Sequence, residues 1–240
     1  MSIHNLDGIF HPKSVAVIGA NERKDGVGSA IMRNLIEGGF RGGIHPINPA
    51  YRSVWGFPFA ASVLDLDAPP DLAVIATPID TAPKIVGQCA RKGVKGAVVI
   101  SAGGRETGEK GRAVEDEIRR AAEGSGMRIV GPNCIGVISH ESRLNASFAP
   151  RMPLPGKTAF ISHSGSIYMS FLDLSIREKM GFSYFVSLGS MLDVDLGDMI
   201  DYLGGDYRVG SIILYMEHLT RFRNFMSAAR AVSRIKPVIA

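Results

Sequence analysis

Residues 14–28, SVAVIGANERKDGVG, carry the pattern around which the chain is organised. A short apolar run, residues 15–18, ends at Gly19, and a polar loop closes on Gly26 and Gly28 before a helix-like segment at residues 29–37. A strand, a glycine loop and a helix N-terminus together hold a phosphate, because the free N–H groups at the helix start point at the anion. The stretch therefore predicts the nucleotide-binding end of a doubly wound sheet, although glycines in a βα turn also serve simply to make a tight corner.

The first half of the chain repeats this strand–helix rhythm. Apolar runs at residues 44–47, 72–76, 97–100 and 128–130 predict four further strands, and amphipathic stretches such as residues 109–123 predict helices between them. Short connections between strand and helix favour a parallel sheet. The carboxyl ends of parallel strands border one crevice, so we expect the ligand there.

A second strand–helix series follows a break. Residues 139–156 contain Pro150, Pro153 and Pro155, which indicates a linker. Strands are then predicted at residues 158–161, 183–187, 211–216 and 237–240, with Asp195 as the N-cap of a short helix. We expect a first domain at residues 1–138, a linker at 139–156 and an incomplete second domain at 157–240. Because the last predicted strand has no covering helix, we also expect the chain to be part of a longer protein.

Composition narrows the classes of function. The chain has 240 residues, of which 45% are hydrophobic, and its net charge of +4 comes from basic residues spread along the sequence. That spread argues against a nucleic-acid-binding surface. No apolar stretch approaches the ~20 residues of a membrane span, and Cys89 and Cys134 lack metal-ligand spacing. We expect a soluble cytoplasmic protein with no nucleic-acid partner, no membrane contact and no metal.

The residues after the second strand bear on which nucleotide binds. NAD-dependent dehydrogenases normally have Asp or Glu there to bind the ribose, whereas this chain has Asn48 and Pro49. The first loop is too long for G-x-G-x-x-G, and Ser29 follows Gly28 where a Walker motif has lysine. These departures disfavour a nicotinamide oxidoreductase. They favour a cofactor that has phosphates and an adenine but no hydride chemistry.

Several short motifs in order carry a family resemblance. SVAVIGA…VG, INPAY, PDLAVIATP, GAVVISAG and GPNCIGV resemble the CoA-binding domain of NDP-forming acyl-CoA synthetases, the superfamily of the succinyl-CoA synthetase α-subunit. TAFISHSGS, GFSYFVSLG, DVDLGDMIDYL and SIILYMEHL resemble the flavodoxin-like domain that follows in that family. LNASFAP, KMGFSYF and SAARAVSRIKP resemble the Pat-type protein lysine acetyltransferases, in which a synthetase-like region is fused to a GNAT domain. The resemblance implies an α/β fold with a Rossmann-like CoA-binding domain followed by a flavodoxin-like domain truncated at its C-terminus.

The resemblance also implies that CoA or acetyl-CoA binds the first domain. The implied phosphate loop is Gly19, Ala20, Asn21, Val27 and Gly28, and the implied adenosine side is Asn48, Pro49 and Tyr51. The implied strand-end walls are Ala76, Thr77, Pro78, Ser101, Ala102 and Gly103, and the thiol end is Asn133 and Cys134. The prolines also fit turns without a binding role. We expect Cys134 to be a packed thiol and not a nucleophile, because the sequence supplies no base beside it.

In this family a histidine carries the phosphate, and the resemblance implies a site for that phosphohistidine on the second domain. The implied residues are Ser162, Ser164, Gly165, Ser166 and Glu217. Glu217 is expected at the end of a buried apolar strand, where a carboxylate favours a site role. His163 lies in the same loop, but the family usually has Gln or Arg there, and its reactive histidine comes after the strand that ends at Ala240. The residues His11, His45, His140 and His218 match no reactive position, so no catalytic residue is expected in this chain.

Two functions remain open. The preferred one is the CoA- or acetyl-CoA-binding regulatory region of a Pat-type protein lysine acetyltransferase. The alternative is a fragment of an active ADP-forming acetyl-CoA synthetase that works through a phosphohistidine beyond residue 240. Expected partners are acyl-CoA and the nucleotide-grasp and GNAT domains of a parent chain, and a homo-oligomer also fits. ADP or ATP with Mg²⁺ would bind only through the nucleotide-grasp domain.

Overall fold

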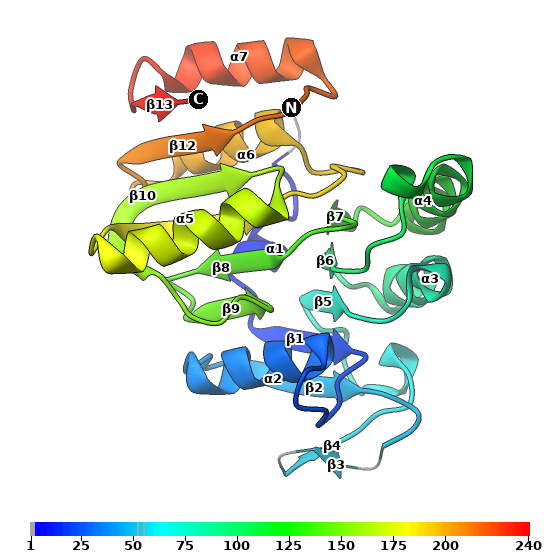
Figure 1. The fold of residues 1–240 in the computed structure, drawn as a ribbon. Helices are drawn as coiled ribbons and strands as arrows, with labels where there is room; N and C mark the ends of the chain where they lie inside the picture. The colour runs from blue at the N-terminus through cyan, green and yellow to red at the C-terminus, as the bar shows by residue number, and fades with distance from the viewer. Residues whose placement is uncertain (1–2, 52, 55) are drawn as a thin grey trace.

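The first half of the chain builds a five-stranded parallel sheet in the computed structural model, which describes residues 3–51, 53–54 and 56–240. Its strands are β1 (Ser14–Ile18), β2 (Gly43–Ile47), β5 (Leu72–Ile75), β6 (Gly96–Val99) and β7 (Arg128–Val130), in the order β2-β1-β5-β6-β7 (Figure 1). All neighbouring pairs are parallel, which confirms the prediction. The strand order reverses between β1 and β5, and ligands of such sheets bind outside the carboxyl ends at that point.

Both faces of this sheet are covered. The helices α3 (Ala82–Lys92) and α4 (Glu109–Ala122) lie on one face, and α2 (Val27–Glu37) lies on the other, beside the second half of the chain (Figure 1). Every residue of β5 and β6 is buried, which is why these strands read as continuous apolar runs. The smaller elements are α1 (Asp7–Phe10), β3 (Ser53–Val54), β4 (Phe57–Pro58) and 3₁₀ turns at Val63–Asp65, Ile79–Thr81 and Arg105–Thr107.

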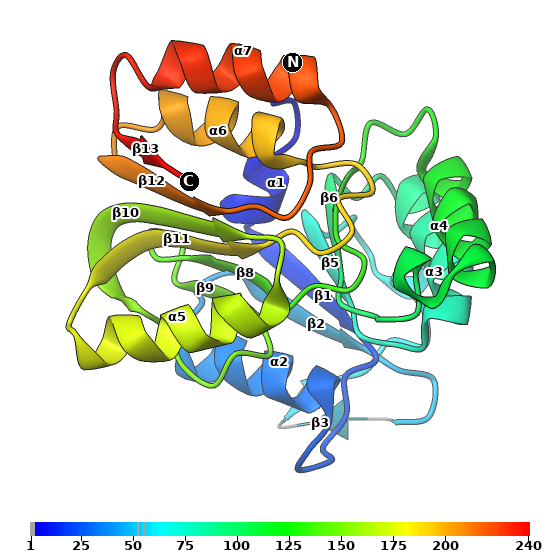
Figure 2. The same cartoon turned by 45° about the horizontal axis from the view of Figure 1, so that its top comes forward.

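The second half builds a six-stranded mixed sheet in the order β13-β12-β10-β11-β8-β9. The strands β10 (Leu154–Ser162), β11 (Gly181–Ser187), β12 (Ser211–Tyr215) and β13 (Val238–Ile239) are parallel, whereas β8 (Gly136–Ser139) and β9 (Leu144–Ser147) form an antiparallel hairpin. Figure 2 shows α5 (Gly165–Arg177) on one face and α6 (Leu196–Gly205) and α7 (Phe222–Val232) on the other. The expected α/β fold, with a Rossmann-like unit before a flavodoxin-like one, is confirmed. Within the described ranges, none of these helices has both the length and the apolarity to cross a lipid bilayer.

The expected linker at residues 139–156 is not free of secondary structure. It contains all of β9 and the start of β10, and β8 pairs antiparallel with β11, so the hairpin belongs to the second sheet. Asn34 of α2 donates from Nδ2 to the carbonyls of Ser147 (2.8 Å) and Ala149 (2.7 Å), which ties the hairpin to the first half. The prolines do not mark a linker, because they lie beside the strands or at the edge of one. Pro150 follows β9, and Pro155 lies in the exposed start of β10, where the strand register shifts.

An ion-pair cluster, named here the ionic clasp, joins the two halves. It consists of Arg128 from β7, Arg221 before α7, and Asp193, Asp195 and Asp198 at the start of α6. Arg128 donates from Nε to Asp193 (2.8 Å) and from Nη2 to Asp198 (3.0 Å). Asp195 caps α6 as predicted, because its Oδ1 accepts from the Asp198 N–H (3.0 Å).

A second polar cluster joins the halves at the other end of α6, which Asp206 follows. The His11 ring lies 2.9 Å from the Tyr184 hydroxyl through Nε2, and Tyr184 donates to Asp206 Oδ2 (2.6 Å). Arg208 donates from Nε to Asp206 Oδ1 (2.8 Å). The two halves are thus joined by polar contacts near both ends of α6.

Candidate functional site

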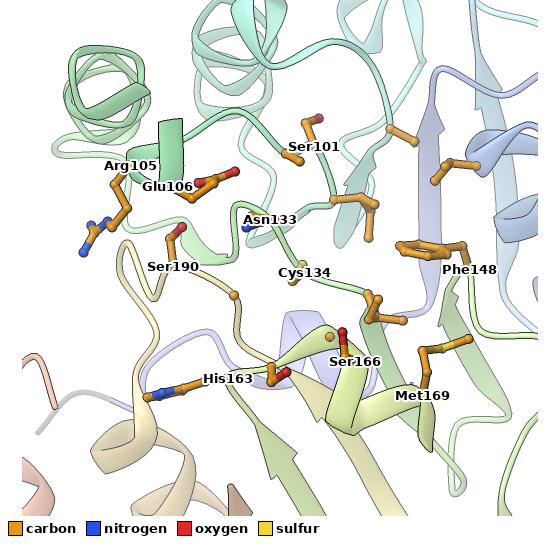
Figure 3. Close-up of a pocket in the computed structure, with 18 of the residues that line it drawn as sticks. Ser101, Arg105, Glu106, Asn133, Cys134, Phe148, His163, Ser166, Met169 and Ser190 are labelled. Atoms are coloured by element: carbon orange, nitrogen blue, oxygen red, sulfur yellow. The ribbon is translucent and has the colours of Figure 1, made fainter. Parts of the chain in front are cut away.

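A cleft of about 940 Å³ lies where the carboxyl ends of the first-sheet strands face the N-terminus of α5 (Figure 3). Both halves of the chain line it. The lining residues that the sequence analysis named are Val27, Ala76, Thr77, Ser101, Ala102, Asn133, Cys134, Ser164, Gly165, Ser166 and Glu217. The cleft thus brings together seven of the sixteen predicted CoA-binding residues and four of the five predicted phosphohistidine-site residues.

A second cavity, of about 420 Å³, lies over the reversal of strand order. Gly19, Asn48, Pro49 and Pro78 line it, and Thr77 lines both this cavity and the cleft. The two hollows are therefore neighbours along the edge of the first sheet. Such a pair suits an elongated ligand that has an adenosine at one end and a reactive group at the other.

The glycine loop joins β1 to α2 with backbone packed on backbone. Gly19 has φ +93°, and a Cβ there would lie 2.7 Å from the Ala76 carbonyl oxygen. A Cβ on Gly28 would lie 2.1 Å from the Gly19 carbonyl oxygen. The helix begins after Gly26, whose lack of a side chain leaves the first turn without a side-chain cap. The N–H groups of that turn have no partner within the helix and lie at its positive end, which fits an anionic group.

Two asparagine side chains from the predicted CoA-binding set hold the shape of the glycine loop. Asn21 donates from Nδ2 to the Gly19 carbonyl (2.9 Å), and Asn48 donates from Nδ2 to the Ala20 carbonyl (2.8 Å). Asn48 therefore joins the end of β2 to the glycine loop while it also lines the second cavity. Ala20, Asn21, Gly28 and Tyr51 line neither hollow, and Tyr51 stacks on Phe59 with ring centroids 5.8 Å apart.

The neighbouring strand ends are held by their own hydrogen bonds. Ser101 donates from Oγ to the Thr77 carbonyl (2.5 Å), which fastens the loop after β6 to the loop after β5. Gly103 lies just outside the cleft, with φ +110°, and donates to Glu106 Oε1 (2.7 Å). The bond between Ser101 and Thr77 thus holds these two loops together where they line the cleft.

Cys134 is a packed thiol, as the sequence predicts. Its residue is 4% exposed, and its Sγ lies 3.3 Å from the Val99 carbonyl oxygen as a donor. Burial raises the pKa of the Cys134 thiol to about 12. A thiol that stays protonated at neutral pH is a poor nucleophile.

The serine hydroxyl groups at the start of α5 have different roles. Two form hydrogen bonds within the loop, and one lies at the cleft. Ser162 is buried outside the cleft and donates from Oγ to the Ser164 carbonyl (2.8 Å). Ser164 is the N-cap of α5, and its Oγ accepts from the Ile167 N–H (3.3 Å). Ser166 lies at the cleft in the first turn of α5 (Figure 3). The first-turn N–H groups that Ser164 does not cap point, with the helix dipole behind them, toward the cleft.

Glu217 lies at the cleft, but the physical reason for expecting it there was wrong. Its strand, β12, is only alternately buried, and Glu217 itself is exposed. The carboxylate therefore needs no buried partner. The Glu217 backbone N–H donates to His163 Nδ1 (3.1 Å), and the rings of His163 and His218 lie 5.0 Å apart.

Several cleft residues are not among those predicted from the sequence. Phe148 and Met169 supply apolar surface, and Phe148 follows β9, in the stretch assigned to the linker. Arg105 reaches the cleft from the loop after β6 (Figure 3). Its Nε donates to Glu115 (2.7 Å), which is buried in α4. The spacing of Glu115 from Gly111 and Ile118 places an acid on the buried face of α4, and this is the sequence signal for the pair, because a buried carboxylate requires a cationic partner.

Among residues 3–51, 53–54 and 56–240, no three His, Cys, Asp or Glu side chains come together as a metal site.

Two family models match the chain. Residues 13–140 match the family described as "CoA binding domain", and residues 155–240 match the family described as "Succinyl-CoA ligase like flavodoxin domain". The chain is 43% identical to acetate–CoA ligase [ADP-forming] I of Archaeoglobus fulgidus, over 98% of this chain and 34% of that protein. It is 40% identical to the α subunit of acetate–CoA ligase [ADP-forming] I of Pyrococcus furiosus, over 98% of this chain and 52% of that subunit.

A solved structure has the same fold. The dinucleotide-forming acetyl-coenzyme A synthetase 1 of Ca. Korarchaeum cryptofilum, in complex with phosphate and ADP, superposes with a TM-score of 0.94 at 37% identity. The match covers 97% of this chain and 50% of that one. The chain thus spans about a third to a half of the length of these relatives.

Proposed function

Because the chain belongs to the CoA-binding domain family and continues into a succinyl-CoA ligase-like flavodoxin domain, we propose that it is the CoA-binding region of an ADP-forming acyl-CoA synthetase. The parent enzyme would join a carboxylic acid to CoA while ATP is converted to ADP and phosphate. The observation that carries the proposal is the glycine loop: an uncapped helix start beside Val27, at the mouth of a cleft that both halves of the chain line.

The residues of the first half fit CoA. The cofactor supplies the thiol that receives the acyl group. Its phosphates would meet the α2 N-terminus after Gly19, its adenosine would lie in the cavity beside Asn48, Pro49 and Pro78, and its thiol end would reach Asn133. The net charge of +4 favours an anionic ligand of this kind.

The second half would take the phosphoryl group. The N–H groups of the first turn of α5, with the Ser166 hydroxyl, would stabilise an anion that a partner domain brings into the cleft. Glu217, on the same cleft, would balance the charge of an incoming histidine. The expected partner is a nucleotide-grasp domain or β subunit, since the Pyrococcus furiosus relative is an α subunit.

The sequence motifs favour the acetyltransferase over the synthetase, and the similarity to known relatives reverses that preference. Those with 40–43% identity are acetate–CoA ligases, which supports the synthetase over the Pat-type acetyltransferase. The residue at the reactive-histidine position after residue 240 of the parent chain separates the two candidates, because the synthetase requires a histidine there. Both cysteines are free thiols, compatible with the reducing cytoplasm that we propose as the compartment.

The test is binding of CoA to the 240-residue chain, measured by calorimetry beside NAD. Val27→Asp places a carboxylate at the first position of α2, where it would repel the phosphates. At about 6 Å and an effective dielectric constant of about 40, the repulsion is about 1.4 kcal/mol, or roughly a tenfold loss of affinity.

Ile36→Asp is the matched control, because Val27 and Ile36 belong to the same helix and are 38% and 40% exposed. We expect the control to bind CoA like the wild type. An equal loss of CoA affinity in both variants would show that the loop does not bind the phosphates. NAD binding as tight as CoA binding would overturn the cofactor assignment. Gly28→Asp is unsuitable, since any Cβ there meets the Gly19 backbone.

A further inference from the structure

The cavity over the reversal of strand order has one wall from α3 and the turn before it. The residues of that wall follow the spacing of a single helix face: Thr81, Lys84, Ile85 and Gln88. Buried apolar side chains from other segments line the cavity as well: Ile18, Ile47 and Val63. Such a lining suits a flat aromatic base, because the faces of a base are apolar and its hydrogen-bonding groups lie along its edge.

Most polar side chains that line this cavity are already engaged. Four of them form hydrogen bonds with neighbouring loop atoms: Asn48, Ser62, Thr77 and Thr81. Gln88 and Lys84 differ, because neither side chain forms a hydrogen bond or an ion pair with any residue within 3–51, 53–54 and 56–240. These two side chains are therefore free to bind a ligand in the cavity.

The Gln88 carboxamide is accessible and matches the edge of adenine. Gln88 is half-buried, and its amide atoms are not among the fully buried atoms that lack a partner. A carboxamide offers a donor and an acceptor side by side. Adenine presents the complementary pair, a ring nitrogen that accepts and an amino group that donates. The Lys84 ammonium group has donors only, so it cannot form this pair.

We propose that Gln88 recognises the adenine base of CoA: its Nε2 donates to an adenine ring nitrogen, and its Oε1 accepts from the exocyclic amino group. The inference rests on the proposed function, because it requires the adenosine of CoA to occupy this cavity. It assigns a specificity-determining residue on α3, apart from the glycine loop and the cleft. The apolar lining holds the faces of the base, and Gln88 selects its edge.

The test compares CoA with etheno-CoA, in which an added ring ties up the amino group and a ring nitrogen of adenine. Both are titrated calorimetrically into the 240-residue chain. We expect the wild type to prefer CoA by roughly five- to a hundredfold, the discrimination typical of a carboxamide paired with adenine. Gln88→Met keeps the length of the side chain but has no amide, so this preference should shrink to within about threefold. Gln88→Leu serves the same purpose if Gln88→Met does not fold.

Arg91→Leu is the matched control, since Arg91 lies on the same helix and lines neither hollow assigned to CoA. It should keep the wild-type preference. Equal binding of CoA and etheno-CoA by the wild type would overturn the proposal and leave the CoA assignment standing. A preference that persists without the amide would also overturn it, because it would then come from the bulk of the added ring. If neither compound binds, the proposed function fails together with this inference.

Discussion

The buried carboxylate of Asp198 forms ion pairs with both halves of the chain, and we expect its loss to lower the free energy of unfolding. Its side chain is 1% exposed, and its Oδ2 accepts from Arg128 and from Arg221, one from each half of the chain. Removing one partner of a buried ion pair typically costs about 3–5 kcal/mol. Here each arginine keeps a second carboxylate, Asp193 or Asp195, so we expect Asp198→Asn to cost about 2–3 kcal/mol.

The assay is thermal unfolding at neutral pH. A change of 1 kcal/mol shifts the midpoint of a chain of this size by about 2–4 °C, so Asp198→Asn should melt roughly 4–12 °C below the wild type. The matched control is Asp173→Asn. Asp173 pairs with Arg177 at 3.5 Å, but the two side chains are 73% and 67% exposed. Exposed pairs contribute about 0–1 kcal/mol, so the control should stay within about 4 °C.

The comparison of the two variants tests the role of the clasp directly. Asp198→Asn removes charge without changing size, so a large loss must come from the arginines that it leaves with fewer acceptors. A midpoint within about 2 °C of the wild type would refute the reasoning. It would show that the apolar core shared by the two halves, which includes Val17 and Val137, holds them together without the clasp.

Three further predictions concern titration and reactivity. His163→Gln should flatten the loss of stability between pH 6.5 and 4, because the pKa of His163 is lowered from 6.5 to about 4 and the unfolded chain takes up the proton first; an unchanged pH profile would contradict the buried neutral ring. Asp206→Asn should remove stability that the wild type has above about pH 4 and loses toward pH 2. Burial alone would raise the pKa of Asp206, but hydrogen bonds from Arg208 and Tyr184 lower it to about 2, so equal melting temperatures at pH 6 would count against this pairing. Cys89 and Cys134 should resist a thiol reagent until the protein unfolds, because burial raises the pKa of each to about 12; rapid labelling of the folded chain would disprove it.

The strand, loop and helix at residues 14–37 follow from the sequence alone. The apolar run becomes β1 because both faces of that strand are buried, and Gly19 and Gly28 are required because a Cβ at either position would meet backbone atoms. These are local constraints, which periodicity and residue type express directly. The parallel first sheet and the N-cap at Asp195 could be predicted for the same reason.

The hairpin at residues 136–147 could not be predicted in this way. Most of it is predicted as a linker because of the prolines that follow at Pro150, Pro153 and Pro155, and nothing in the stretch itself shows that it pairs with β11 and packs on α2. Pairing between segments that are distant in sequence depends on which faces remain open after the rest has folded. The sequence pattern shows that a face is apolar, but not which segment covers it.

The candidate site also has local features that the sequence predicts and long-range features that it does not. The glycine loop and the start of α5 could be predicted, since each is a short segment whose chemistry is local. Three other features are visible only in the folded chain: both segments line one cleft, Phe148 joins them there, and His163 Nε2 is buried without a hydrogen-bond partner among the described residues. Burial and the meeting of distant side chains are properties of the packed chain. They arise when two halves, each with its own sheet, close on one another.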